Sequence, residues 1–242
     1  MMAVFKKEFF GFLHSLIAYV VMGVFLTGTG LLMWVFPETS VLDYGYADMD
    51  TLFSMGPYVF IFLVPAITMK SFAEEKKLGT LELLFTRPLS DWQILLGKFL
   101  ASFALVFFSL LPTLVYYFSV RQLGSPVNNI DTPGVIGSYI GLLLLGGIFC
   151  CIGVLASALT ANQIVAFILA AFLCFFFYAG FDSVSSLMAT GHTALFVKQM
   201  GIIYHYESLS KGLIDSRDLV YFLSVGAGFL LLTKTALSSR TW

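Results

Sequence analysis

Long apolar runs separated by short polar segments dominate the pattern of the chain. Six runs approach the length of about 20 helical residues that the hydrocarbon core of a bilayer requires. They are continuous and do not alternate between polar and apolar positions, which favours helices over the strands of a β-barrel. The predicted spans are residues 15–36, 53–69, 97–118, 136–157, 163–182 and 219–235. Ionisable residues are confined to the ends of these spans, at Lys98, Asp182 and Lys234.

A second kind of element precedes the first span. Aromatic side chains share one helical face of this segment, and lysines lie opposite that face or at its flank; these residues are Phe5, Phe9, Lys6 and Lys7. The pattern is typical of a helix that lies in the membrane interface, and we predict one over residues 1–14. The chain is expected to bend at Gly11 or at residues 14–15. The alternative is a simple extension of the first span.

Composition agrees with this pattern. Hydrophobic residues make up 59% of the 242 residues and charged residues 11%, against about 45–50% and about 25% in ordinary globular chains. So few charges cannot cover the surface of a soluble protein of this size. The sequence therefore predicts a single all-α, polytopic membrane domain over residues 1–242. The net charge of −1 gives no reason to expect a nucleic-acid partner.

The distribution of lysine and arginine predicts the orientation, because cytoplasmic loops carry an excess of these residues. With both termini, residues 70–98 and the loop 158–162 on one face, nine positive side chains lie there: Lys6, Lys7, Lys70, Lys76, Lys77, Arg87, Lys98, Lys234 and Arg240. The other face holds four: Arg121, Lys198, Lys211 and Arg217. We therefore expect a multi-pass protein of the cytoplasmic (inner) membrane with both termini in the cytoplasm.

The cytoplasmic segment between the second and third spans, residues 70–92, is too long for a tight turn. Apolar residues at helical spacing predict one short amphipathic helix within it, formed around Leu78, Leu81, Leu84 and Phe85. Pro88 is expected to end that helix. Ser90 with Gln93 forms the capping-box pattern that starts the third span. Such a loop is either a docking surface or a helix lying on the membrane, and the residues favour neither.

Two stretches resemble a known family. Residues 74–101, EEKKLGTLELLFTRPLSDWQILLGKFLA, resemble the cytoplasmic signature of ABC-2 type permeases, which are membrane subunits of ATP-binding cassette (ABC) transporters. Residues 205–224, HYESLSKGLIDSRDLVYFLS, resemble a segment shared by the gliding-motility-associated permease F subunit and the permeases of nitrous-oxide-reductase maturation. Together the two stretches point to the gliding-motility branch, and the resemblance covers essentially the whole chain.

The resemblance implies an architecture and partners. In a type V exporter-like fold, the N-terminal interfacial helix corresponds to the connecting helix, and residues 70–92 carry the coupling helix that contacts an ABC ATPase. Residues 183–217 correspond to external re-entrant helices between spans five and six. A second permease copy, or a companion permease or accessory subunit, completes the complex. Carried over by position, the ATPase-coupling residues are Glu74, Glu75, Gly79, Thr80 and Glu82.

No ATP site is expected in this chain. The P-loop needs the pattern GxxxxGK[ST], so that backbone N–H groups and a lysine cradle the phosphates. Gly97-Lys98 is followed by Phe99 and has Trp92 where the first glycine of the motif belongs. ATP and Mg²⁺ are therefore expected on the partner subunit, and this chain is expected to be a permease rather than an enzyme.

The outer segment, residues 183–217, is too apolar for a free loop and too interrupted for a span, so we expect short helices half-buried at the outer interface. His192 and His205 lack the carboxylate pattern of a zinc site, and ordinary polar roles are favoured over metal binding. Candidates for contact with a substrate at the outer mouth are Tyr204, His205, Tyr206 and Glu207.

Small residues at four-residue spacing predict close approach between helices. The pairs are Gly137 with Gly141 and Gly153 with Ser157. The spacing does not say whether the neighbouring helix belongs to the same chain or to a second copy.

Other classes of membrane protein fit less well. A proton- or sodium-driven transporter usually carries ionisable residues at mid-membrane, and an intramembrane enzyme needs clustered catalytic or metal-binding side chains. The predicted spans show neither pattern. A non-transporting scaffold, or a mechanical-coupling subunit of a motility or secretion complex, stays the alternative to an ABC permease. Spans rich in Phe, Leu, Ser, Thr and Tyr favour a lipidic or amphiphilic cargo, or a polymer, over a bare ion.

Overall fold

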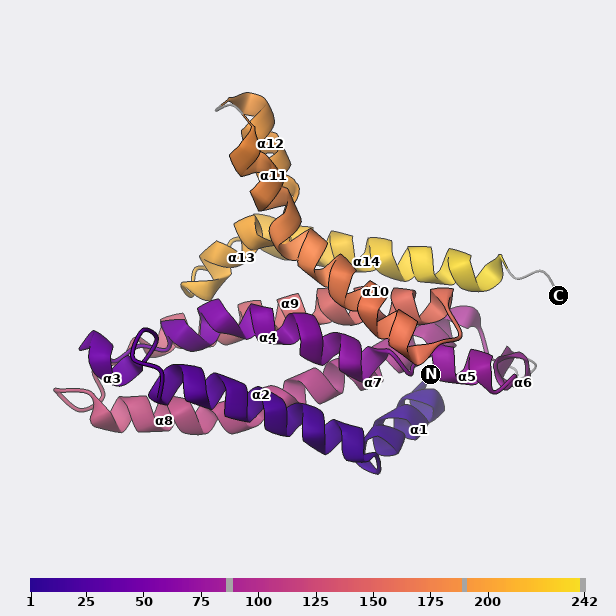
Figure 1. The fold of residues 1–242 in the computed structure, drawn as a ribbon, viewed down its shortest axis with the longest axis horizontal. Helices are drawn as coiled ribbons and strands as arrows, with labels where there is room; N and C mark the ends of the chain where they lie inside the picture. The colour runs from indigo at the N-terminus through magenta and orange to yellow at the C-terminus, as the bar shows by residue number, and fades with distance from the viewer. Residues whose placement is uncertain (86–88, 189–190, 240–242) are drawn as a thin grey trace.

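The computed structural model describes residues 1–85, 89–188 and 191–239, and its regular structure within these ranges is entirely helical (Figure 1). This confirms the predicted all-α fold class. The elements are α1 (Met2–Leu13), α2 (Leu16–Trp34), α3 (Val41–Tyr44), α4 (Asp50–Thr68), α5 (Ala73–Lys77), α6 (Leu81–Phe85), α7 (Asp91–Leu110), the 3₁₀ turn η1 (Leu111–Thr113), α8 (Leu114–Leu123), α9 (Thr132–Leu159), α10 (Gln163–Phe175), the π-helical stretch η2 (Phe176–Gly180), α11 (Phe181–Leu187), α12 (His192–Met200), α13 (Ile202–Ser210) and α14 (Ser216–Ser238).

Six helical segments are long and apolar enough to cross a membrane, as predicted: Leu16–Trp34, Asp50–Lys77, Asp91–Leu123, Thr132–Leu159, Gln163–Leu187 and Ser216–Ser238. Most of them extend beyond the predicted apolar runs. At the N-terminal ends, polar side chains outside these runs cap the helices and set their first residues. Side-chain oxygens accept hydrogen bonds from first-turn N–H groups of α7, α9, α10 and α14, and they belong to Ser90, Asp131, Asn162 and Asp215.

The bundle is built around α9. Helices α4, α7, α10, α13 and α14 pack against it, and α2 packs against α4. Most of α9 is buried, whereas α10 and α14 are largely exposed. Their outward side chains include Ile168, Phe172 and Leu223. A large exposed apolar surface marks a face that lipid or another protein covers.

The ends of the bundle collect different parts of the chain (Figure 1). The helices α1, α5 and α6 and the end of α14 lie at one end, which we call the α5 end. The helix α3 and the loop after α8 lie at the other, which we call the α3 end. Segments that the charge distribution assigns to the cytoplasm thus share one end. The side of the membrane stays a prediction, and Arg87 and Arg240, which contributed to it, lie outside the described residues.

The N-terminal helix is distinct from the first span. It ends at Leu13, and the Ser15 hydroxyl caps α2, so the break falls at residues 14–15, one of the two predicted positions. Helix α1 packs against α7, where a Cβ added at Gly97 would lie 2.9 Å from Val4 Cβ. This close approach to α7 favours a separate element over an extension of the first span. Its location in a membrane interface stays a prediction.

The segment between α4 and α7 differs from the single short helix predicted over residues 78–85. It forms two helices, α5 and α6, because the backbone turns at Gly79, whose φ is +67°. The N–H groups of Gly79 and the next residue bond back to carbonyls of α5 at 3.3 and 3.0 Å, in a Schellman motif. Leu78 consequently leaves the apolar face and is 66% exposed, while Leu81 is buried. Pro88 lies outside the described residues.

The fifth span runs from α10 through η2 into α11. It therefore ends at Leu187, past its predicted end at residue 182. Helices α11 and α12 then form an antiparallel hairpin. The Ser185 hydroxyl donates to the Ala194 carbonyl at 2.8 Å, and Lys198 lies 3.3 Å from Asp182 across the hairpin. The hairpin stands away from the bundle, whereas α13 lies back against it (Figure 1). Re-entry of this region into a bilayer stays a prediction, and residues 189–190 lie outside the described ranges.

Candidate functional site

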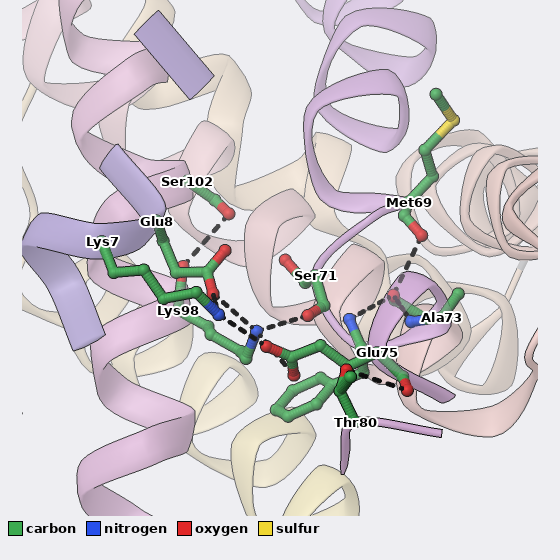
Figure 2. A network of polar contacts seen from close by, with 11 residues as sticks. Lys7, Glu8, Met69, Ser71, Ala73, Glu75, Thr80, Lys98 and Ser102 are labelled. Atoms are coloured by element: carbon green, nitrogen blue, oxygen red, sulfur yellow. Dashed lines mark hydrogen bonds and ion pairs between the residues drawn. The ribbon is translucent and has the colours of Figure 1, made fainter. Parts of the chain in front are cut away.

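A buried lysine joins three elements at the α5 end. Lys98 lies near the start of α7 and is 1% exposed. Its Nζ lies 2.8 Å from Glu8 Oε1 on α1 and 3.0 Å from Glu75 Oε2 on α5. It also donates to the Ser71 carbonyl and lies 5.0 Å from the centre of the Phe72 ring. Figure 2 shows the carboxylates and the carbonyl converging on the ammonium group.

Burial of the charge dictates this arrangement. Taking an ammonium group out of water costs several kcal/mol, and the cost is offset only when counter-charges and acceptors surround it. Lys7 of α1 completes the set, 3.0 Å from Glu75 Oε1 and 3.5 Å from Glu8 Oε1. Partial burial acts to lower the pKa of Lys7, but the contacts with Glu75 and Glu8 outweigh it and raise that pKa. Two lysines and two carboxylates thus form a neutral network, the Lys98 network, between α1, α5 and α7.

A second set of contacts fixes α5 to the end of α9. The Ser157 hydroxyl accepts hydrogen bonds from two backbone N–H groups at the start of α5, at 2.9 and 3.0 Å, and lies 3.0 Å from the Met69 carbonyl, to which it donates. Lys76 donates to the Ala158 carbonyl. The base of α5 is therefore held from two sides, by α9 and by the Lys98 network.

The predicted ATPase-coupling residues fall into two groups. Glu75 faces inward, with a side chain that is 13% exposed, because Lys98 requires its charge. This corrects the expectation that Glu75 is available to a partner. Glu74 is half-buried. An exposed rim is left, which we call the α5–α6 edge, formed by Lys77, Leu78, Gly79, Thr80 and Glu82.

The residues predicted for the interfacial helix partly contact protein. The rings of Phe5 and Phe9 stack with centroids 5.6 Å apart, and Phe9 lies at the same centroid distance from Phe108 of α7. Lys6 is exposed, and Lys7 belongs to the Lys98 network. The aromatic face of α1 is thus turned in part towards α7.

The four predicted outer-mouth residues lie on α13 but face different surroundings. Tyr204 and Glu207 are exposed. Tyr206 is buried, and its hydroxyl donates to the Phe53 carbonyl of α4 at 2.7 Å. This corrects the expectation that Tyr206 is open to a substrate, since its side chain instead anchors α13 to the bundle.

His205, the remaining member, contacts the neighbouring helices. Its Nδ1 lies 2.7 Å from Asp218 Oδ1 on α14, and its Nε2 lies 3.0 Å from the Gln199 carbonyl oxygen on α12. The ring stacks on Tyr221 with centroids 3.8 Å apart. Ser208 donates to the second Asp218 oxygen. Because the carboxylate lies between serine and histidine, the group lacks the nucleophile–base contact of a hydrolase triad. The described residues contain no cluster suited to a metal ion.

Three important side chains were not predicted as site residues. Lys98 was noted only at the end of a span, and neither Glu8 nor Asp218 was assigned to a site. A signal was present in the sequence, because Glu8 is the one acidic residue in the first 37 positions and Lys98 sits eight residues past the Ser90 cap in an apolar run. Neither observation identifies a partner.

Six helices long and apolar enough to cross a membrane, with a fixed, exposed segment at one end, define a polytopic helical membrane protein. Comparison with known families then gives the family: the profile described as ABC-2 family transporter protein matches residues 36–200, more than half of the chain. The protein therefore belongs to the ABC-2 transporter family. The family forms the transmembrane permease subunit and is not itself catalytic, and membership implies an ABC ATPase and membrane lipid as partners. No match was found among curated proteins.

Proposed function

We propose that this chain couples ATP hydrolysis on a separate ABC ATPase to the export or translocation of a substrate. The observation that carries the proposal is the α5–α6 edge. It is exposed at the end of the bundle, yet its base is fixed by Ser157 and by the Lys98 network. A flexible loop would deform when a partner moves against it, whereas a segment fixed in this way transmits the displacement to the helices that hold it.

The ATPase would dock on the α5–α6 edge. Glu82 and Lys77 offer charges of opposite sign there, and charged pairs at the rim of an interface set its register more than its affinity. ATP and Mg²⁺ would be bound by the partner. The α5 end would then face the cytoplasm, in agreement with the positive-inside prediction.

Lys98 and Glu75 would act as positioning residues behind this edge. Pulling α5 away from α7 would leave the buried ammonium short of a counter-charge, which is costly. Movement of α5 would therefore carry α7 and α1 with it. Helix α7 begins the third span, and α1 leads into the first through residues 14–15, so a displacement at the edge would reach two spans.

The proposal extends to the class of cargo and to the assembly of the transporter. The scarcity of charge in the spans supports a lipidic or amphiphilic cargo, or a polymer. Six spans supply half of an ABC translocation unit, so a second copy or a companion permease would complete it. The resemblance of residues 205–224 supports an inner-membrane complex linked to bacterial gliding motility, and a gene deletion that leaves gliding intact would contradict that link.

The test separates docking from transmission. The tagged full-length chain is purified from membranes of its host, the co-purifying ATPase is identified, and ATP hydrolysis is measured in proteoliposomes. Charge reversal by Glu82→Arg replaces the attraction to a basic group of the partner by like-charge repulsion, which costs more than loss of a rim pair, and it is expected to weaken ATPase binding about tenfold. Glu75→Gln is expected to bind the ATPase as the wild type does, but no longer to stimulate ATP hydrolysis by the ATPase. Asp43→Arg reverses an exposed charge at the α3 end and serves as the matched control, with binding and stimulation unchanged.

Three outcomes would contradict parts of the proposal. Full ATPase binding by Glu82→Arg would exclude the α5–α6 edge as the docking surface. Purification of the wild type without any ABC ATPase would favour the scaffold or mechanical-coupling function. ATP hydrolysis is also screened for stimulation by lipids, polysaccharides and ions. Stimulation by a small ion alone would exclude a lipidic, amphiphilic or polymeric cargo.

A further inference from the structure

His205 is placed between two hydrogen-bond acceptors. A neutral imidazole has one N–H donor and one bare nitrogen, and a backbone carbonyl can only accept. Nε2 faces the Gln199 carbonyl at 3.0 Å, and Nδ1 faces Asp218 Oδ1 at 2.7 Å. The other oxygen of Asp218 accepts from Ser208. With a neutral ring and an ionised carboxylate, one ring nitrogen would face an acceptor with no hydrogen between them.

We propose that His205 and Asp218 form a proton-binding site. The pair holds one proton more than a neutral imidazole and a carboxylate together, and this proton completes both contacts of the ring. The count is the same whether the proton resides on the ring or is shared with the carboxylate. His205 lines an open cavity of about 720 Å³, which gives the proton a path to and from the surface of the protein.

The site lies at the joint between the α11–α12 hairpin and the bundle. Gln199 is near the end of α12, His205 is on α13, and Asp218 is in the first turn of α14. Helix α13 is fixed to the bundle by Tyr206, whereas the hairpin stands away from it. A second link, from the Tyr221 hydroxyl to the Met200 carbonyl at 2.7 Å, is independent of the proton. Loss of the proton therefore loosens the joint without releasing it.

The charges around the site are balanced apart from Asp218. From α12 the neutral Gln199 faces the ring, and from α14 the Tyr221 ring stacks on it. The other ionisable groups that line the adjoining cavity are Tyr204, Glu207, Lys211, Asp215 and Arg217. Two of these side chains are acidic and two are basic, so Asp218, in direct contact with the ring, dominates the interaction with the added proton.

Hydrogen–deuterium exchange of the full chain in nanodiscs tests the site. Protection of residues 199–210 is measured between about pH 5 and about pH 8.5, the range in which histidine changes charge, after correction for the intrinsic exchange rate. In the wild type, protection is expected to fall about tenfold as pH rises, because a charge-assisted hydrogen bond is lost. In His205→Gln, which has no titrating ring, protection is expected to be independent of pH.

Asp218→Asn distinguishes a proton site from a merely structural carboxylate. The amide of the variant can donate to a neutral ring at Nδ1 and still accept from Ser208, so the contacts are complete without the added proton. Protection is therefore expected to stay high at the alkaline end. The matched control is His192→Gln, an exposed histidine at the start of α12, which should keep the wild-type pH dependence.

Three results would overturn the proposal. These are wild-type protection that does not change with pH, a pH dependence that persists in His205→Gln, and loss of protection by Asp218→Asn at the alkaline end. If His205→Gln fails to fold, the exchange protection of Asp218→Asn at alkaline pH still tests the proposal. None of these measurements needs an ATPase or a cargo, so the site can fail or stand independently of the proposed transport function.

Discussion

At the scale of single residues, small side chains on α9 decide which helices can come close. Thr68 of α4 fills the space beside Gly153, where an added Cβ would overlap its Oγ1. A Cβ at Gly137 would lie 2.5 Å from the Gly212 carbonyl oxygen, and one at Gly141 would lie 2.6 Å from Leu209 Cβ. The predicted small-residue pairs therefore serve packing within the chain, against α4, α13 and the turn that follows α13.

Gly153→Ala is expected to destabilise the protein by about 1–3 kcal/mol, because the added methyl group overpacks the contact with Thr68. The measurement is thermal unfolding of the purified protein in detergent. Gly147→Ala on the same helix is the control, since its Cβ would meet Phe103 at an ordinary 3.4 Å. Equal unfolding temperatures for the two variants would show that the α4–α9 contact yields without cost.

Ser157→Ala is expected to cost about 2–6 kcal/mol, because two N–H groups at the start of α5 lose a buried acceptor and each carries a penalty of about 1–3 kcal/mol. Ser109→Ala is matched in burial, but its hydroxyl bonds the Leu105 carbonyl of its own helix, so its loss should matter little. Exchange of the α5 amides should rise in the first variant and stay unchanged in the second. Unchanged α5 exchange in Ser157→Ala would contradict the anchoring role.

At the scale of elements, the break between α5 and α6 determines what a partner can reach. The left-handed turn at Gly79 ends α5 and points Leu78 outward, while Leu81 turns inward to pack with Phe72, Ile94 and Leu95. A single continuous helix would have placed Leu78 on the apolar face and would have had no corner at Gly79, where α5 now turns into α6. The exposed edge is therefore a product of one backbone angle and of the packing of α6 beneath it.

Gly79→Ala is expected to cost about 1–2 kcal/mol, because an L-residue pays that penalty in the left-handed region. Gly228→Ala, in a helix with open space around the position, should be neutral or slightly stabilising. ATPase stimulation in proteoliposomes should fall in the first variant only. If Gly79→Ala kept full stimulation and stability, the corner would not be needed for coupling.

At the scale of the whole molecule, the two ends of the bundle should lie on opposite sides of the membrane. The three native cysteines are buried and should not react with a membrane-impermeant maleimide. In right-side-out spheroplasts, Asn129→Cys in the loop after α8 should be labelled, and Thr80→Cys on the α5–α6 edge should be labelled only after lysis. The reverse pattern would invert the predicted orientation.

Much of the fold was predictable because its signals are local. Six apolar runs, the break near Ser15 and the Ser90–Gln93 capping box depend on residues within one or two helical turns of each other. The site was predictable only in part. Lys98 and Glu8 are 90 positions apart in the sequence, and the orientation of Glu75 depends on that lysine being buried. Hydrophobic spacing also could not reveal the left-handed turn at Gly79.

The sequence by itself determined that the protein is helical, that it has six spans, and that Ser90 with Gln93 begins the third one, since hydropathy and capping act over short stretches of chain. Only the tertiary structure decided which charges meet. Packing of α1 and α5 on α7 brings two carboxylates to Lys98, and packing of α12, α13 and α14 brings His205 to Asp218. Burial creates the need for these partners, and burial is a property of the assembled bundle.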